Sequence, residues 1–186
     1  MALTLLMITF PEIRALFDLN GDRRYGGEPV SQLEHALQCA RLAEEGGASD
    51  ELITACLLHD FGHLFNERGT TPTLRGVDDK HQFYAASALK NVFPDAVRVP
   101  IYLHVEAKRY LCAVTAGYRD DLSADSRRSL ELQGGPLNDV DAGKFIEQLH
   151  ASDAVRLRFW DDHAKVAGAR TPDLDHYLGI ARRCAA

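Results

Sequence analysis

An apolar run that contains two histidines and one aspartate, "LLHDFGHLF" at residues 57–65, most constrains what this chain can fold into. The stretch at residues 52–58 leaves no clear polar face on a helix, which is typical of a helix buried at the centre of a fold. An unpaired buried carboxylate costs several kcal/mol unless its pKa shifts until the group is neutral. The chain must therefore place a cation or counter-charges opposite Asp60.

The patterns on both sides of this run predict an all-α, single-domain protein. Ser31 and Glu34 form a capping box that starts a helix, Gly46-Gly47 ends it, and Ser49-Asp50 starts the next. No convincing pair of alternating strands is present. The other predicted helices cover about 1–20, 80–92, 94–109, 123–133, 138–149, 152–167 and 173–184, with N-caps at Ser123, Asn138 and Ser152 and a kink or break at Pro100. The polar residues 66–80 are predicted to form a loop that could lie over a site.

The net charge and the spacing of the cysteines indicate which partners and which compartment to expect for this chain. The chain has 186 residues and a formal net charge of −6, which argues against broad binding to nucleic acid or to a membrane but leaves a small anionic substrate open. The four cysteines are scattered without a C-x-x-C pair, so we expect a reducing cytoplasm. The apolar N-terminus has no basic residue before it and meets Pro11, so we expect neither a signal peptide nor a membrane span. We expect a monomer or a weak oligomer.

Several histidines together with the His59-Asp60 dipeptide favour a metal site. A lone histidine in an apolar helix is more often a core residue than a ligand, but five of the eight lie in or beside apolar helical patterns: His35, His59, His63, His81 and His104. Imidazole binds Zn, Fe, Mn, Cu and Ni, and a carboxylate can bridge two metal ions. A metal ion would also supply the counter-charge that Asp60 needs.

The order His35, His59-Asp60, Asp161 resembles the H…HD…D signature of the HD-domain superfamily, a group of helical metal-dependent enzymes. His81 and His104 match the two-metal subset of that superfamily. The resemblance implies one ion held by His35, His59, Asp60 and Asp161, and a second held by Asp60, His81 and His104, with Asp60 as the bridge. It also implies a single HD domain over residues 1–186, with a metal-binding core at about 25–167 between an N-terminal helix (about 1–20) and a C-terminal helix (about 173–184).

Five segments carry a narrower resemblance: "YGGEPVSQLEHALQCA" (25–40), "HDFGHL" (59–64), "HVEAKRYLC" (104–112), "LSADSRRSLELQGG" (122–135) and "RFWDDHAK" (158–165). They resemble the HD-domain diiron oxygenases of the 2-amino-1-hydroxyethylphosphonate dioxygenase (glycine-forming) family, one relative of which cleaves the N-trimethylated analogue. The resemblance covers about residues 25–180. It implies two iron ions in a mixed-valent Fe(II)/Fe(III) state and O2 as co-substrate. The implied reaction is oxidative cleavage of the carbon–phosphorus bond of a 1-hydroxy-2-aminoethylphosphonate, or its N-methylated analogue, to glycine or a betaine plus phosphate.

Helical spacing and the same resemblance suggest the residues that bind this organophosphonate. Lys108 lies four residues after His104 and Arg158 three before Asp161, so each shares a helix face with a ligand and could bind phosphonate oxygens. His63, four residues after His59, also points towards the site. Ser126 could supply a hydroxyl and Gln32 an amide.

Tyr25 and Glu28 lie on either side of two glycines that would let this segment move as a lid. The resemblance implies that the tyrosine occupies the open position of one iron until substrate arrives. It implies that the glutamate works with the tyrosine and recognises the substrate amine. The identity of the nitrogen group, primary amine or trimethylammonium, stays open.

Two other functions stay open at this point. The first is an HD-domain phosphohydrolase that uses Mn, Mg, Zn or Fe to act on a nucleotide or phosphomonoester. The second is a non-enzymatic helical binding or signalling domain in which the ligand set is a relic. Trp160 is expected in the core or the pocket wall, and the remaining candidates are expected at the surface: Asp139, Asp141, Asp162, His150, His163 and His176.

Overall fold

The computed structural model describes residues 7–65 and 73–186, and this part of the chain contains helices and no β-strand. An isolated antiparallel bridge joins Arg24 and Ser31. The helices are α1 (Phe10–Asn20), α2 (Gln32–Glu45), α3 (Asp50–Leu58), α4 (Gly62–Phe65), α5 (His81–Ala88), α6 (Asp95–Val114), α7 (Tyr118–Asp121), α8 (Ala124–Leu132), α9 (Asp139–Ile146), α10 (Ala151–His163) and α11 (Leu174–Cys184), with short 3-10 turns η1 (Thr73–Arg75) and η2 (Leu89–Asn91). The all-α prediction is confirmed.

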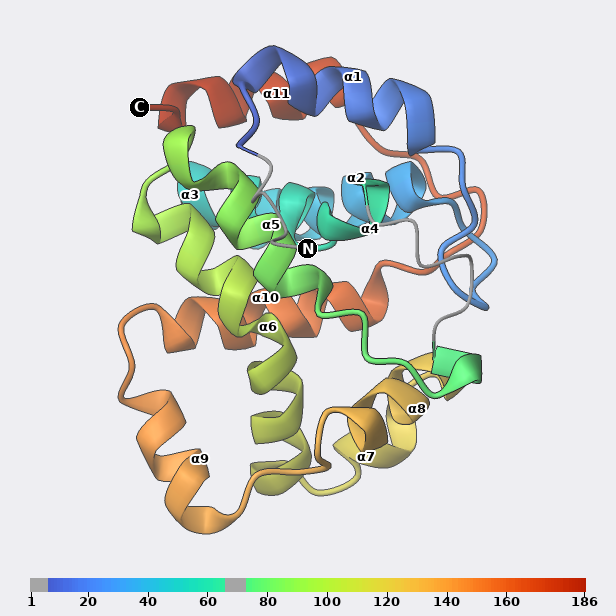
Figure 1. Ribbon diagram of the computed structural model, residues 1–186, viewed down its shortest axis with the longest axis vertical. Coiled ribbons are helices and arrows are strands. Elements are labelled where there is room, and N and C mark those ends of the chain that lie inside the picture. The colour runs from blue at the N-terminus through green and yellow to red at the C-terminus, as the bar shows by residue number, and fades with distance from the viewer. Residues whose placement is uncertain (1–6, 66–72) are drawn as a thin grey trace, which may run out of the picture.

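Helix α3 lies at the centre of the fold. Every residue from Leu52 to Leu58 is buried, because α2, α6, α10 and α11 all pack against this helix. In Figure 1, α1 and α11 lie above the layer that contains α2 and α3, and α10 crosses below it. The lack of a polar face, which was the main constraint in the sequence, therefore reflects contact with neighbours on all sides.

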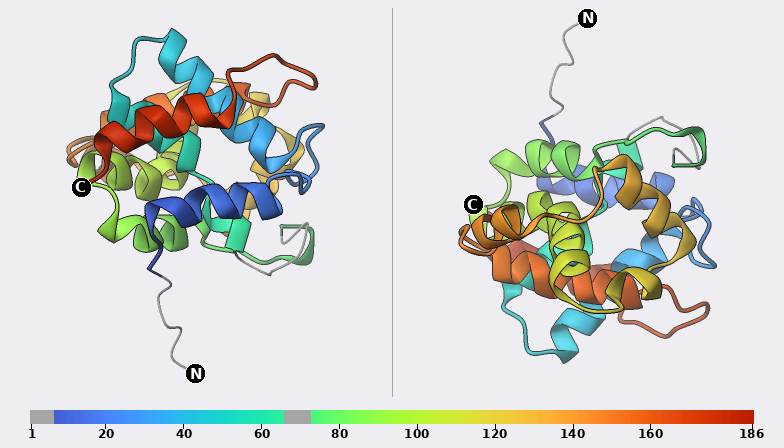
Figure 2. Two further views of the ribbon diagram at one scale, coloured as in Figure 1. Left: turned by 90° about the horizontal axis from the view of Figure 1, so that it is seen from above. Right: turned by 90° about the horizontal axis from the view of Figure 1, so that it is seen from below.

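Helix α6 connects the main core to a smaller one. Its N-terminal part packs against α3 and α5, and its C-terminal part packs against α7 and α9. The smaller core consists of Leu103, Ala107, Leu137, Ala142, Phe145, Ala151 and Ala154. Seen from below, α8 lies on one side of α6 and α9 on the other (Figure 2).

Local capping signals place most of the helix starts. The Ser31 hydroxyl accepts a hydrogen bond from the Glu34 amide at 3.1 Å, and the Glu34 carboxylate accepts one from the Ser31 amide at 2.7 Å. Ser123 and Asn138 cap α8 and α9 in the predicted way. The prediction of Ser152 as an N-cap is wrong, because the chain turns at His150, whose φ of 64° lies in the left-handed region, and α10 is already helical at Ala151.

Of the kink or break predicted at Pro100, the break is wrong, since α6 continues through this residue to Val114. A proline removes one backbone hydrogen bond, and the burial of Pro100 beside Ile101 against the core offsets this loss. The N-terminal helix begins at Phe10 rather than near the first residue, with Thr9 and Glu12 forming its capping box. The first six residues, and residues 66–72 of the predicted loop, lie outside the described part of the chain. None of the described helices is both long and apolar enough to cross a membrane.

Candidate metal centre and substrate cavity

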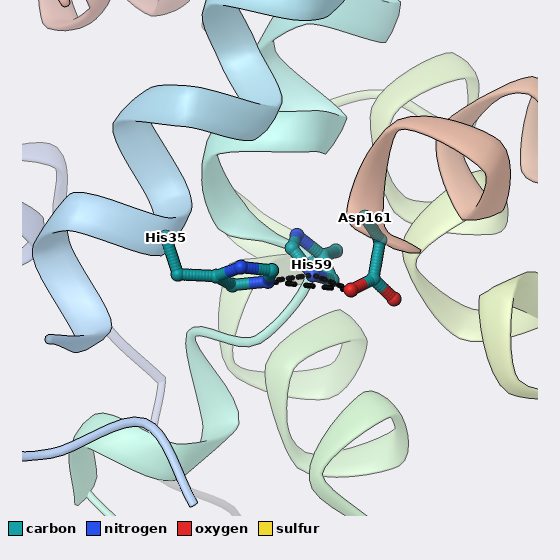
Figure 3. A group of neighbouring side chains, drawn as sticks. All are labelled: His35, His59 and Asp161. Carbon is teal, nitrogen blue, oxygen red and sulfur yellow. Dashed lines mark hydrogen bonds and ion pairs between the residues drawn. The ribbon is translucent and has the colours of Figure 1, made fainter. Parts of the chain in front are cut away.

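The first group of candidate ligands comes from three segments that are far apart in the sequence. His35 lies on α2, His59 directly follows α3, and Asp161 lies on α10, and their side chains point towards one another (Figure 3). The His35 Nε2 atom lies 3.1 Å from His59 Nε2 and 3.4 Å from Asp161 Oδ1. All three residues are buried. Their three ligand atoms are close enough together to bind one ion.

Asp60 divides its two carboxylate oxygens between this group and a second one. Its Oδ2 lies 3.4 Å from His59 Nε2 and 3.7 Å from His35 Nε2. Its Oδ1 lies 3.2 Å from His81 Nε2 and 3.7 Å from His104 Nε2. One carboxylate therefore faces two pairs of imidazoles through two different oxygens, which is the arrangement expected of a bridging ligand.

The imidazoles direct Nε2 inwards because other groups hold their Nδ1 atoms. The Nδ1–H groups of His35, His59 and His104 donate to the carbonyl oxygens of Ala164, Cys56 and Ile101 at 2.9, 2.9 and 2.7 Å. A carbonyl only accepts, so these bonds keep the proton on Nδ1 and leave a lone pair on Nε2. In their neutral forms, His35 and His59 would face each other with Nε2 lone pairs at 3.1 Å, and so would His81 and His104 at 3.1 Å. A cation between such atoms turns repulsion into attraction, and imidazoles held in this way are typical of metal ligands.

The buried carboxylates of the cluster also favour the binding of cations. Asp161 Oδ1 is buried and accepts no hydrogen bond from the described residues. Burial alone would raise the pKa of Asp60, but His59 and His81 hold it well below its usual value. Burial would lower the pKa of His81, yet the carboxylates of Asp60 and Asp79 raise it to about 10. The protein alone thus balances its carboxylates with protons on Nε2 atoms, and metal ions would displace those protons.

Asp79 fixes two of the imidazoles and was not identified from the sequence. Its Oδ1 accepts from His81 Nδ1 at 2.8 Å, and its Oδ2 pairs with His63 Nδ1 at 2.9 Å. The two rings stack with their centroids 4.2 Å apart, and His63 Nε2 lies 3.8 Å from Asp60 Oδ1. The structure therefore brings His63 to the centre, and Asp79 orients it together with His81. The only sequence signal for Asp79 is its place two residues before a candidate ligand.

A cavity of about 410 Å³ opens onto the second pair of imidazoles. The candidate ligands Asp60, His81, His104 and Asp161 line it, together with six of the residues predicted to bind the substrate: Tyr25, Gln32, His63, Lys108, Ser126 and Arg158. Glu28 is not among the described residues that line the cavity. Its backbone amide donates to the Tyr25 carbonyl at 2.9 Å, closing a turn on the outer side of the same segment.

Tyr25 covers the first group of ligands. Its ring stacks on the His35 imidazole with centroids 3.9 Å apart and an angle of 14° between the planes. Burial, followed by the charges of Asp60 and Asp161, raises the pKa of its hydroxyl well above the usual value. A neutral phenol therefore lies beside the carboxylates, in a position to keep water from that side of the cluster.

Lys108 and Arg158 bring positive charge to the cavity although both are buried, with exposed fractions of 3% and 5%. The Lys108 ammonium donates to Ser129 Oγ at 2.6 Å, a partner on α8 that the sequence did not reveal. Burial, with the charge of Arg158 adding to it, lowers the pKa of Lys108 to about 7. Arg158 donates from Nη1 to Asp161 Oδ2 at 2.5 Å, so a cavity cation and a candidate ligand support each other.

Asp162 corrects one prediction, because it is not a surface residue. It is partly buried and pairs with Arg158, whose Nε lies 3.2 Å from Asp162 Oδ2, and it accepts a hydrogen bond from the Tyr118 hydroxyl. Lys165 lies 3.9 Å from Asp162 Oδ1 and donates to Ser126 Oγ at 3.4 Å. Asp162 and Tyr118 together hold the Arg158 guanidinium in place.

The other acidic residues and histidines lie away from the centre. Asp139, Asp141, His163 and His176 are exposed, as predicted. His150 is partly buried at the start of α10, where it pairs with Asp153. Trp160 packs against the main core rather than the cavity.

Comparison with known proteins gives one family match and three similar relatives. The family model of the HD domain matches residues 32–125. Hydroxymethylphosphonate dioxygenase of Gimesia maris is 46% identical over 175 residues, covering 92% of this chain and 87% of that protein. The [1-hydroxy-2-(trimethylamino)ethyl]phosphonate dioxygenase (glycine-betaine-forming) of Leisingera caerulea is 37% identical over 171 residues, with the same coverage of 92% and 87%. An uncharacterized protein of Acanthamoeba polyphaga mimivirus, L432, is 32% identical over 89% of this chain and 76% of its own length.

Proposed function

The chain belongs to the HD-domain family and, within it, to the hydroxyphosphonate dioxygenases, and from this premise we propose that it uses iron and O2 to cleave the carbon–phosphorus bond of a 1-hydroxyphosphonate. The observation that carries the proposal is the division of the Asp60 oxygens between two pairs of imidazoles beside a cavity lined by Lys108 and Arg158. A pair of cations and an anionic substrate are the ligands that this arrangement suits.

Two iron ions in the mixed-valent Fe(II)/Fe(III) state would fit the two groups of ligands. His35, His59, Asp60 and Asp161 would hold one ion, and Asp60, His81 and His104 would hold the other. When bound, this pair supplies the site for the substrate's hydroxyl and phosphonate oxygens and the activation of O2, which protein side chains cannot provide. The overall reaction, R–CH(OH)–PO₃²⁻ + O₂ → R–COO⁻ + HPO₄²⁻ + H⁺, breaks the C–P bond and places one oxygen atom of O2 in each product.

The side chains of the cavity position the substrate and balance its charge. The Lys108 ammonium and the Arg158 guanidinium would bind phosphonate oxygens, because charge-assisted hydrogen bonds of this kind are the strongest that side chains form. Ser126, Gln32 and His63 would complete the set of polar contacts. Tyr25, stacked on His35, would shield the first ion from water and move aside when the substrate's oxygens arrive, with Glu28 at the outer end of the same lid.

An assay of phosphate release with iron-loaded protein tests the proposal. Hydroxymethylphosphonate and 1-hydroxy-2-aminoethylphosphonate, with its trimethylated analogue, are each incubated in air and under argon. We expect phosphate only in air, one O2 consumed per phosphate, and an EPR signal of a mixed-valent pair. Equal phosphate release under argon, or turnover of p-nitrophenyl phosphate without O2, would instead support the phosphohydrolase function.

The compartment and the assembly are also part of the proposal. The four cysteines are free thiols in the structure, in keeping with the reducing cytoplasm that their spacing predicts. The monomer or weak oligomer, and a small organophosphonate rather than nucleic acid or membrane as the partner, stay predictions. A size-exclusion measurement on iron-loaded protein tests the first of these.

A further inference from the structure

Lys165 is a cation behind the cavity wall that the proposed set of substrate contacts does not include. It follows α10, between Ala164 and Val166, and only 11% of its side chain is exposed. It is not among the described residues that line the cavity. Removing an ammonium group from water and holding a long side chain in one place both cost free energy. The contacts that hold Lys165 have to offset these costs.

The backbone on both sides of Lys165 is attached to α2. The Ala164 carbonyl accepts from His35 Nδ1 at 2.9 Å. The buried Gln38 amide donates to the Val166 carbonyl at 3.1 Å and accepts from the Val166 amide at 3.0 Å. Three hydrogen bonds from two residues one helical turn apart therefore fix the main chain at Lys165 relative to the first group of candidate ligands.

The Lys165 ammonium lies between two carboxylates and one hydroxyl. Its Nζ atom is 4.0 Å from Asp161 Oδ1 and 3.9 Å from Asp162 Oδ1, and it donates to Ser126 Oγ at 3.4 Å. The centroid of the Tyr25 ring is 6.0 Å away, at the outer limit of a cation–π contact. The carboxylates balance the charge from beyond hydrogen-bonding distance. Among the described residues, Ser126 is thus the hydrogen-bond partner of this ammonium.

This contact determines what the Ser126 hydroxyl can do. An ammonium group only donates, so the hydroxyl oxygen accepts from Lys165 and its own proton must point elsewhere. Within the described ranges that proton has no acceptor, and Ser126 lines the cavity. Ser129, one turn further along α8, differs because its oxygen accepts from Lys108 at 2.6 Å and its hydroxyl donates to the Ser126 carbonyl at 3.0 Å. Ser126 can therefore donate to an acceptor in the cavity, whereas the Ser129 proton is already used.

We propose that Lys165 is a positioning residue of the substrate site, which holds the Ser126 hydroxyl as a hydrogen-bond donor to a phosphonate oxygen. The inference rests on the proposed function and deepens it, because Lys165 would control binding without touching the substrate. The oxygens of a phosphonate dianion only accept, so a hydroxyl that is already oriented as a donor loses less freedom on binding. The positive charge behind the Ser126 oxygen also polarises its O–H group and strengthens its bond to an anion.

A double-mutant cycle on substrate binding tests this coupling, because a purely electrostatic effect of Lys165 would not depend on the serine hydroxyl. The Kd of hydroxymethylphosphonate is measured by calorimetry under argon, where the proposed reaction cannot proceed. The iron-loaded proteins are the wild type, Lys165→Met, Ser126→Ala and the double variant. Ser126→Ala should raise the Kd at least about tenfold, because it removes a hydrogen bond to a charged group.

Lys165→Met should raise the Kd at least about fivefold when Ser126 is present. In the Ser126→Ala background this factor should be at least about threefold smaller, since residues in contact commonly show coupling of this size. The iron content of Lys165→Met should equal that of the wild type, which separates positioning from damage to the metal centre. Lys144→Met is the matched control, because Lys144 is exposed on α9 and the loss of its charge should leave the Kd unchanged in both backgrounds.

An equal factor for Lys165→Met in both backgrounds would overturn the proposal, and so would a loss of iron from this variant. If Lys165→Met does not fold, Lys165→Ala is run through the same cycle with the same expected factors. Binding with the expected coupling but without phosphate release in air would refute the proposed function alone. Failure of the wild-type protein to bind hydroxymethylphosphonate would overturn both.

Discussion

Replacing Asp60 by asparagine tests the shared carboxylate most directly. The substitution keeps the shape of the side chain but turns one of the two oxygens into an amide NH2, which cannot bind a cation. In the structure the two oxygens face different imidazole pairs, at 3.2 Å from His81 Nε2 and 3.4 Å from His59 Nε2. Whichever oxygen is replaced by the amide nitrogen, one of the two imidazole pairs loses the Asp60 oxygen that faces it. We expect iron content to fall from two ions per chain to one or none.

The expected effect on stability follows from linkage. An ion present at 100 times its Kd stabilises the folded state by about 2.7 kcal/mol if it binds only that state. A protein of this size changes its Tm by about 2–4 °C per kcal/mol. Removing one ion should therefore lower the Tm by about 5–11 °C. Adding a chelator should lower the wild-type Tm by roughly twice the shift seen in the Asp60→Asn variant.

Elemental analysis and calorimetry, each with and without chelator, measure both quantities. Asp139→Asn is the matched control, because Asp139 is an exposed residue in the first turn of α9 and should change neither the iron content nor the response to chelator. Two tightly bound irons per chain in Asp60→Asn, with the wild-type response to chelator, would refute the bridging role.

Four further predictions concern the surroundings of the centre. Lys108→Met should raise KM by about 10- to 150-fold with unchanged iron content, because a hydrogen bond to a charged group contributes about 1.5–3 kcal/mol; steady-state kinetics with elemental analysis check this, and an unchanged KM would contradict the phosphonate role. Because the pKa of Lys108 is lowered to about 7, its ammonium form is present below that pH and lost above it, so kcat/KM should fall as pH rises through about 7; Lys108→Arg, which stays charged, should abolish that fall. Asp79→Asn should weaken iron affinity by about 10- to 100-fold in a chelator competition, since the groups that orient imidazoles have effects of this size, and wild-type affinity would exclude the orienting role. Gly62→Ala should destabilise the protein by at least about 1–3 kcal/mol in a urea titration because its Cβ would lie 2.2 Å from the His81 carbonyl oxygen, whereas Gly143→Ala, whose Cβ meets nothing within 4 Å, should not.

The sequence predicted those parts of the molecule whose signals are local. The capping box of Ser31 and Glu34, and the caps Ser123 and Asn138, act within three residues, so their patterns suffice to place the starts of α2, α8 and α9. Pro100 also acts locally, but it does not end α6, because the helix packs against the core around it, and the sequence pattern alone does not contain that packing.

The candidate ligands could be predicted because their order and chemistry are distinctive, whereas their supporting partners could not. Asp79 orients His63 and His81 across a loop, and Ser129 reaches Lys108 from another helix. Asp162 looks like a surface residue next to Asp161 until Tyr118 and Arg158 are placed beside it. Aspartate and serine at such positions are common in any sequence, so only their spatial neighbours distinguish them.

The candidate ligands and the cavity's outer wall belong to different parts of the architecture. His59 and Asp60 follow the most buried helix, α3. The other candidate ligands lie on α2, α6 and α10, which pack against α3, and on α5, which packs against α6. The outer wall belongs to peripheral segments, in which Arg23 and Arg24 are exposed and Tyr25, Ser126 and Ser129 are partly buried. Substitutions in these outer segments can therefore alter the shape and charge of the cavity entrance without moving the candidate ligands.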